Sequence, residues 1–163
     1  MQIIIKNKDT IFLDKFKFKC VLGKNGVTLK KKEGDLKTPK GTYSIGPLFF
    51  RKDKIHKVET QLKKIPIKRD MYWCNYVKSK YYNKLITSKK FGSHEKMFRN
   101  DRKYDLVVVI NYNTKKIIKK KGSAIFLHLT NNYKKTEGCV AIKKIDMLIL
   151  LKIINKKTKI KIY

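Results

Sequence analysis

Alternating apolar and polar residues dominate the start of the chain, and this alternation is typical of half-buried β-strands. The clearest runs cover residues 2–6, 10–13 and 15–22, the last of which contains Phe-Lys-Phe-Lys-Cys. Residues 23–26, with the sequence Gly-Lys-Asn-Gly, predict a turn. Residues 27–30 then predict a strand that returns from this turn.

Four further segments complete the predicted strands. Residues 42–45 resume a strand that Gly46-Pro47 is expected to close. Residues 104–112 (YDLVVVINY) predict the clearest buried strand, and residues 124–129 predict the next. Lys alternates with Ile and Tyr in residues 158–163, which predicts a closing strand.

Two segments favour helices instead. Apolar residues recur at near-helical spacing over residues 145–154, and Asp146 suits the first turn of a helix. Residues 93–99 begin with Ser93, a favourable N-cap, and predict a second, short helix. The strongly aromatic residues 70–83 predict a packed loop or cover rather than a linker.

A chain of 163 residues is long enough to bury a proper core, and no internal repeat or domain boundary is visible. We therefore expect residues 1–163 to form one mostly β domain with one or two helices. No run approaches the length of a membrane span, and the N-terminus lacks the layout of a signal peptide.

The charge is unusual, because 42 Lys and Arg face 12 Asp and Glu and give a net charge of +30. Such a field attracts polyanions, and a basic β-rich nucleic-acid-binding module is the alternative from another class. Only four of the 42 basic residues are Arg, however, whereas nucleic-acid readers favour Arg for bidentate contacts. We therefore interpret the charge mainly as a solvated, Lys-rich surface and expect no nucleic-acid partner.

The cysteines narrow the chemistry further. Cys20, Cys74 and Cys139 are odd in number, lie far apart and form no Cys-x-x-Cys pair, so neither a disulfide framework nor a metal site is expected. Cys139 opens an apolar run shortly after another apolar run that ends with His128. A thiol and an imidazole brought together in this way are the parts of a cysteine nucleophile with its general base.

The turn before the cysteine supports this hypothesis. Gly138 suits a tight backbone turn, which would let the main-chain amides of Gly138 and Cys139 form an oxyanion hole. The sequence therefore predicts acyl transfer with Cys139 as nucleophile and His128 as general base, and no cofactor is expected.

Three blocks of the chain resemble the L,D-transpeptidase (YkuD-type) catalytic domain family, in particular a short single-domain bacterial subgroup. Residues 32–43 (KEGDLKTPKGTY) form the first block, and residues 93–113, from Ser-His-Glu to Asn-Tyr-Asn, form the second. Residues 122–141 form the third, with GSAIFLH before TEGCVA. The commonest family pattern around the nucleophile is S-H-G-C-[IV]-R, so the second histidine and the arginine are missing from this chain.

The resemblance implies a β-sandwich-like fold and cross-linking of peptidoglycan stem peptides. In this family a cysteine attacks a tetrapeptide stem, D-alanine leaves, and an amine of another stem captures the thioester. Capture by water would instead make the protein an L,D-carboxypeptidase or hydrolase. The resemblance also implies that a backbone carbonyl orients His128, and a location in the cell envelope or periplasm. A cytoplasmic location is the alternative, since no export segment is visible.

The polar and aromatic residues of the matched region supply candidates for substrate contact. His94, Glu95 and Arg99 are the polar candidates, with Arg99 able to hold a carboxylate. Trp73 and Tyr82 could line a groove for the stem peptide. A capping or ion-pair role for the first three, and core packing for the aromatic residues, are the alternatives.

Overall fold

The computed structural model describes residues 1–163 and consists mainly of β-strands, with one α-helix and one short 3-10 helix. Along the first half of the chain the strands are β1 (Gln2–Lys6), β2 (Thr10–Leu13), β3 (Phe16–Val21), β4 (Val27–Thr28), β5 (Thr38–Pro39), β6 (Gly41–Phe50), β7 (Lys64–Pro66) and β8 (Tyr72–Cys74). The second half holds β9 (Leu85–Ile86), the 3-10 helix η1 (Lys89–Phe91), β10 (His94–Lys96), β11 (Leu106–Ile110), β12 (Phe126–Leu129), β13 (Val140–Ile142), α1 (Lys144–Ile153) and β14 (Lys159–Ile162). The prediction of a mostly β fold is confirmed.

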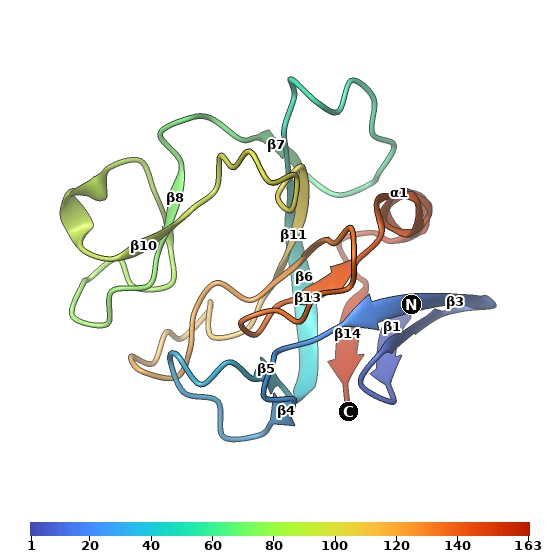
Figure 1. Cartoon of the computed structure of the whole chain (residues 1–163), viewed down its shortest axis with the longest axis horizontal. Coiled ribbons are helices and arrows are strands. Elements are labelled where there is room, and N and C mark those ends of the chain that lie inside the picture. Colours follow the sequence, from blue (N-terminus) through green and yellow to red (C-terminus); the bar gives the residue numbers. More distant parts are fainter.

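One large sheet closes on itself and forms the body of the molecule (Figure 1). Its strands follow the order β11-β12-β13-β3-β2-β1-β14-β6-β7, and an additional pairing joins β11 to β6. The long strand β6 makes this closure possible, because its first half pairs with β14 and its second half with β11. β7 lies outside the ring, in parallel pairing with β6. The sheet is therefore barrel-like.

Alternation along the strands divides the apolar residues between two cores. Residues from most strands of the ring form the larger core together with Met147, Leu150 and Leu151 of α1. Val107 of β11 and Phe126 of β12 belong instead to a second, smaller core. Successive residues of a strand point to opposite faces, so the same strands contribute to both cores. The second core covers the outer face of the ring and positions the candidate site.

A smaller lobe, formed by residues 67–105, lies beside this outer face (Figure 1). It holds a three-stranded sheet in the order β10-β8-β9. Trp73 and Met97 of the lobe are buried in the second core, and the indole of Trp73 packs edge-on against Phe126, with ring centroids 5.0 Å apart. The aromatic segment predicted as a packed loop or cover thus contains β8 and attaches the lobe to the ring.

Several local predictions agree with the structure. The first three alternating runs form β1, β2 and β3, which pair antiparallel in sequence order. The helical spacing predicted over residues 145–154 corresponds to α1, with Asp146 in its first turn. The closing strand corresponds to β14, which pairs in parallel with β1.

The short helix predicted over residues 93–99 is wrong, because this segment pairs with a distant strand. β10 lies antiparallel to β8 and places Glu95 opposite Trp73. Ser93, the expected N-cap, donates a hydrogen bond to the side chain of Asn75 instead. Strand pairing across the lobe therefore overrides the local capping signal.

Two strand predictions also need correction. The strand expected to close at Gly46-Pro47 continues to Phe50, because the pairing of β6 with β11 shifts register between Leu48 and Ile45. Such an irregularity accommodates a proline, which has no N–H to donate. The segment expected to return from the turn at residues 23–26 pairs as β4 in parallel with β5 rather than along β3.

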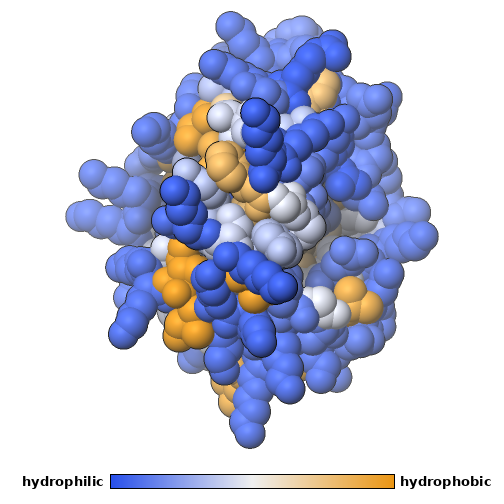
Figure 2. Space-filling model, turned by 90° about the vertical axis from the view of Figure 1, so that its left-hand side faces the viewer, coloured by the Kyte–Doolittle hydropathy of each residue, from blue (hydrophilic) through white to orange (hydrophobic).

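Hydrophilic side chains cover nearly all of the molecular face that carries the lobe, and apolar atoms gather there only in small groups (Figure 2). The largest exposed apolar side chains lie far apart in the sequence, as with Leu29, Ile118 and Ile145. The excess of Lys is thus spread over the surface as a solvated layer, while the apolar residues fill the two cores.

Candidate active site

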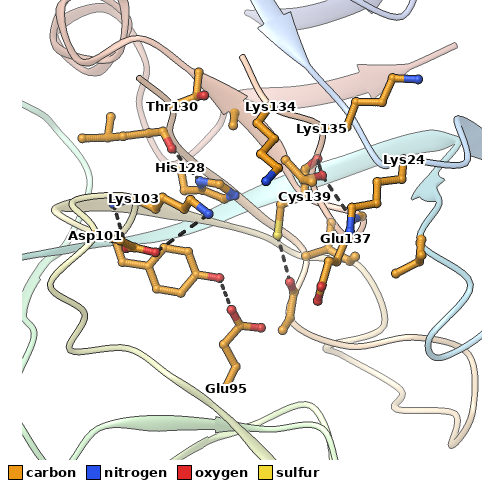
Figure 3. A pocket seen from close by; sticks show the side chains of 18 of the residues that line it. Lys24, Glu95, Asp101, Lys103, His128, Thr130, Lys134, Lys135, Glu137 and Cys139 are labelled. Carbon is orange, nitrogen blue, oxygen red and sulfur yellow. Dashed lines mark hydrogen bonds and ion pairs between the residues drawn. The ribbon is translucent and has the colours of Figure 1, made fainter. Parts of the chain in front are cut away.

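The strands β12 and β13 bring His128 and Cys139 to the same face of the large sheet. They pair in parallel, with Leu127 opposite Val140 and His128 opposite Ala141. Leu127 and Val140 belong to the core inside the ring, so their neighbours His128 and Cys139 point outward. Both side chains line one cavity of about 520 Å³, and Figure 3 shows the imidazole and the thiol in this pocket.

A backbone carbonyl orients the imidazole. His128 is 6% exposed, and its Nδ1 lies 2.9 Å from the carbonyl oxygen of Leu129. A carbonyl only accepts hydrogen bonds, so Nδ1 carries the proton and Nε2 is the basic nitrogen. The ring of Tyr104 packs against His128 with centroids 5.3 Å apart. Burial lowers the pKa of His128 to about 4, so the imidazole is neutral near pH 7 and can accept a proton.

This buried imidazole makes the stability of the fold depend on pH. In the unfolded chain His128 takes up a proton near pH 6.5, whereas in the folded protein its pKa is about 4. Between these two pH values the unfolded state binds more protons, so stability falls as the pH falls. We expect this group alone to remove about 3 kcal/mol across that window.

Urea unfolding of the wild type and of His128→Gln at pH 7 and pH 4.5 measures this effect. The variant should lose less free energy of unfolding over the interval, because glutamine does not titrate. The acidic groups common to both proteins cancel in the comparison. Equal losses in the two proteins would contradict the prediction.

The thiol of Cys139 is held in a neutral resting state. Its Sγ donates to the carbonyl oxygen of Ala124 at 3.2 Å and accepts from the N–H of Phe126 at 3.4 Å. Burial raises the pKa of Cys139 to about 12, and the carboxylate of Glu95 adds to the rise. No hydrogen bond joins Sγ to His128 in this state. The thiol must therefore turn away from Ala124 before the imidazole can accept its proton.

Thr136 and Gly138 fix the turn that delivers Cys139. The hydroxyl of Thr136 donates to the carbonyl oxygen of Cys139 at 2.7 Å and accepts from the N–H of Gly138 at 3.1 Å. Gly138 has a φ of 144°, and a Cβ there would lie 2.9 Å from the carbonyl oxygen of Lys37, so glycine is required. The N–H of Gly138 is used inside the turn. The N–H of Cys139, which makes no such turn or side-chain bond, is left as the candidate oxyanion donor.

Asn83 holds the segment that faces the thiol. Its buried amide oxygen accepts from the indole N–H of Trp73 at 2.8 Å and from the N–H of Ala124 at 3.0 Å. Its amide nitrogen donates to the carbonyl oxygens of Tyr112 and Asn113. Asn83 and Ala124 both have left-handed backbones, with φ of 57° and 52°, and these four bonds offset that cost. The carbonyl that accepts the thiol proton is thus fixed by the lobe.

Glu95 and Arg99 line the cavity, as a substrate-binding role requires, but both are already engaged. The hydroxyl of Tyr104 donates to the carboxylate of Glu95 at 2.5 Å, and Arg99 pairs with the same carboxylate at 3.6 Å. Arg99 also pairs with Asp101 at 2.5 Å and lies over the ring of Tyr104. Burial raises the pKa of Glu95. One wall of the cavity is therefore an internally paired network.

Trp73, Tyr82 and His94, expected as candidates for substrate contact, do not line the cavity. Trp73 is buried in the second core, and Tyr82 is 2% exposed with its hydroxyl bound to the carboxylate of Glu33. His94 of β10 packs against Tyr72 of β8 within the lobe. Each of the three side chains is engaged in contacts within the protein that support the walls of the site.

Three features of the site are absent from the sequence-based predictions. The role of Asn83 depends on contacts with three distant segments, although its position beside Tyr82 in a matched region is a weak signal. The hydroxyl of Thr136 could be inferred from the Thr-Glu-Gly-Cys turn. The inward direction of Lys134, visible in Figure 3, has no sequence signal in a chain this rich in lysine.

No group of three or more His, Cys, Asp or Glu side chains converges anywhere in the chain in a way that could hold a metal ion. No helix of the structure is long and apolar enough to cross a membrane.

A buried thiol and a neutral imidazole in one cavity, with a backbone N–H beside the sulfur, are groups that cysteine acyl-transfer sites use. A sequence comparison agrees, because the family model of the L,D-transpeptidase catalytic domain (YkuD) matches residues 2–162. The chain belongs to this family, whose members modify peptidoglycan.

Two solved structures are similar to the chain. One is Bd1075 from Bdellovibrio bacteriovorus, with a TM-score of 0.49, and the other is the helical cell shape determining protein Pgp2 from Campylobacter jejuni, with a TM-score of 0.48. Each is 17% identical and aligns with 99% of this chain. The chain spans 46% of the length of either structure. No curated protein matches the sequence.

Proposed function

We propose that the protein transfers acyl groups between peptidoglycan stem peptides, with Cys139 as the nucleophile and His128 as the general base. Family membership supports the substrate class. The observation that carries the chemistry is the single cavity that both side chains line. The acyl donor is a tetrapeptide stem, the acceptor is an amine of a second stem, and the reaction takes place in the cell envelope.

The first half-reaction forms a thioester. The thiol of Cys139 turns toward His128, whose Nε2 takes its proton while Sγ attacks the carbonyl carbon of the donor. The oxygen of the tetrahedral intermediate carries the negative charge, which the N–H of Cys139 stabilises. His128 then gives its proton to the leaving nitrogen, the carbon–nitrogen bond breaks, and D-alanine departs.

The second half-reaction consumes the thioester. His128 takes a proton from the attacking amine, the new amide bond forms, and the sulfur leaves and recovers the proton. Water in place of the amine would give a shortened tripeptide instead of a cross-linked dimer. Because both groups are neutral near pH 7, proton transfer accompanies attack, and no thiolate–imidazolium pair is needed beforehand.

Incubation with a disaccharide-tetrapeptide under reducing conditions tests the proposal. Mass spectrometry should detect either the cross-linked dimer or the tripeptide, and the ratio of the two reports the preferred acceptor. Neither product should form with heat-denatured protein. If the folded wild type yields neither product, the proposed function is wrong.

A further inference from the structure

The cavity of the proposed active site contains positive charge that its own acids do not balance. Its cationic lining residues are Lys24, Lys31, Arg99, Lys103, Lys134 and Lys135. Acidic partners engage Lys31, Arg99 and Lys103 in ion pairs. Lys24, Lys134 and Lys135 form no ion pair in the protein. His128 adds no charge near pH 7, and the nearby cations Lys103 and Arg99 are paired with Asp101, so the three unpaired lysines are the cations left for a ligand.

The loop between β12 and β13 directs one of these lysines inward. The ring of Tyr133 packs against the ammonium groups of Lys19 in β3, at 4.8 Å, and of Lys143 at the start of α1, at 5.5 Å. The N–H of Lys134 donates to the side chain of Asn132 at 3.1 Å, which fixes the backbone at this position. Because Tyr133 is anchored away from the cavity, the next side chain is free to turn into it.

Figure 3 shows the outcome of this anchoring. The ammonium group of Lys134 points into the pocket, in the direction of His128 and Cys139. The neighbouring Lys135 also belongs to the rim, but its ammonium group points away from the pocket. The two adjacent lysines therefore differ in the direction of their ammonium groups, and only that of Lys134 faces a ligand in the pocket.

We propose that Lys134 binds the free carboxylate of the residue that leaves from the acyl donor, so that the site selects peptides ending at that residue. This inference rests on the proposed function and names a specificity determinant for it. A lysine ammonium is a suitable partner for a carboxylate, because the charge-assisted hydrogen bond is stronger than a neutral one.

The position of His128 decides which part of the donor meets Lys134. The imidazole must protonate the leaving nitrogen, so the leaving residue lies on the imidazole side of Cys139. In an α-amino acid the carboxylate is attached to the same carbon as that nitrogen. A cation on the imidazole side is therefore placed for the carboxylate of the leaving group, whereas the paired network of Glu95 lies elsewhere on the cavity wall.

A donor whose terminal carboxylate is blocked tests this assignment. The rate of release of the leaving residue is measured by mass spectrometry for a disaccharide-tetrapeptide and for the same compound ending in a carboxamide. The wild type should have a kcat/KM about five- to ten-fold higher for the free acid, as expected for one partly exposed charged contact. The preference should shrink when the salt concentration is raised, since salt screens the pair.

Two variants of adjacent residues make the test specific. Lys134→Gln should lower kcat/KM for the free acid about five- to ten-fold and leave the carboxamide rate unchanged, while Lys134→Arg should retain the preference. Lys135→Gln removes the same charge from the protein and should behave as the wild type. Thermal unfolding of each variant confirms that the fold is kept.

Equal rates of the wild type on the acid and the carboxamide would overturn the carboxylate site and leave the proposed function intact. An equal loss on both donors in Lys134→Gln would also overturn it, because the lysine would then act generally. If the wild type released no residue from either donor, the proposed function itself would fail and this inference with it.

Discussion

Cys139→Ala is expected to abolish turnover, with a loss of at least about a thousand-fold that reaches the limit of detection. The variant removes the only atom in the cavity that can form a thioester, while the rest of the cavity stays in place. Because the thiol makes only two weak hydrogen bonds, to Ala124 and from Phe126, its removal should leave the fold intact. Product formation from the disaccharide-tetrapeptide measures the loss, and intact-protein mass spectrometry should show no acyl adduct.

The other buried thiols provide matched controls. Cys20 lies in the core inside the ring and Cys74 in a small cluster of the lobe, and both are more deeply buried than Cys139. Cys20→Ala and Cys74→Ala should each cost about 1–2 kcal/mol of stability and keep full activity. Activity in Cys139→Ala, or its loss in both controls, would contradict the assignment of the nucleophile.

His128→Gln is expected to lower the rate of acylation by about a hundred- to ten-thousand-fold near pH 7. The reason is the high pKa of Cys139, about 12, which leaves almost no thiolate at neutral pH unless a base assists. The variant should therefore react only through its small thiolate fraction. Its rate should rise about ten-fold per pH unit over the alkaline range, whereas the wild-type rate should be nearly independent of pH between about 5 and 9.

Acylation by a carbapenem-type probe, followed by intact-protein mass spectrometry, gives these pH profiles without an acceptor. His94→Gln is the control, since His94 lies outside the cavity and should leave the profile unchanged. A flat profile in His128→Gln would mean that another group activates the thiol.

The sequence is sufficient to predict most of the ring and the meeting of His128 with Cys139 in one cavity, because local patterns determine both. Alternating apolar residues specify β1, β2, β3 and β14, and helical spacing specifies α1. His128 lies near the end of β12, and Cys139 lies directly before β13. Parallel pairing of these two strands therefore brings the two residues to one face of the sheet. Because successive side chains of a strand point to opposite faces, both side chains point away from the core inside the ring.

The lobe could not be predicted in the same way, because its strands exist only through pairing across distant segments. β10 is held by β8, which overrides the helix-capping signal of Ser93. The position of Trp73 and Tyr82 outside the cavity could not be predicted, for a related reason. Exposed and buried aromatic residues look alike in a sequence, and only the contacts with Phe126 and Glu33 distinguish them.

The closure of the large sheet has a consequence for the behaviour of the protein at high concentration. A chain with so many Ile and Val residues would recruit other copies if it exposed a long free strand edge. The pairing of β6 with β11 removes such edges from the ring, and the strand left outside it is short. That strand, β7, contains Lys64 and Pro66. The charge of the lysine and the absence of a backbone N–H in the proline both discourage pairing with another molecule, so the edge resists aggregation.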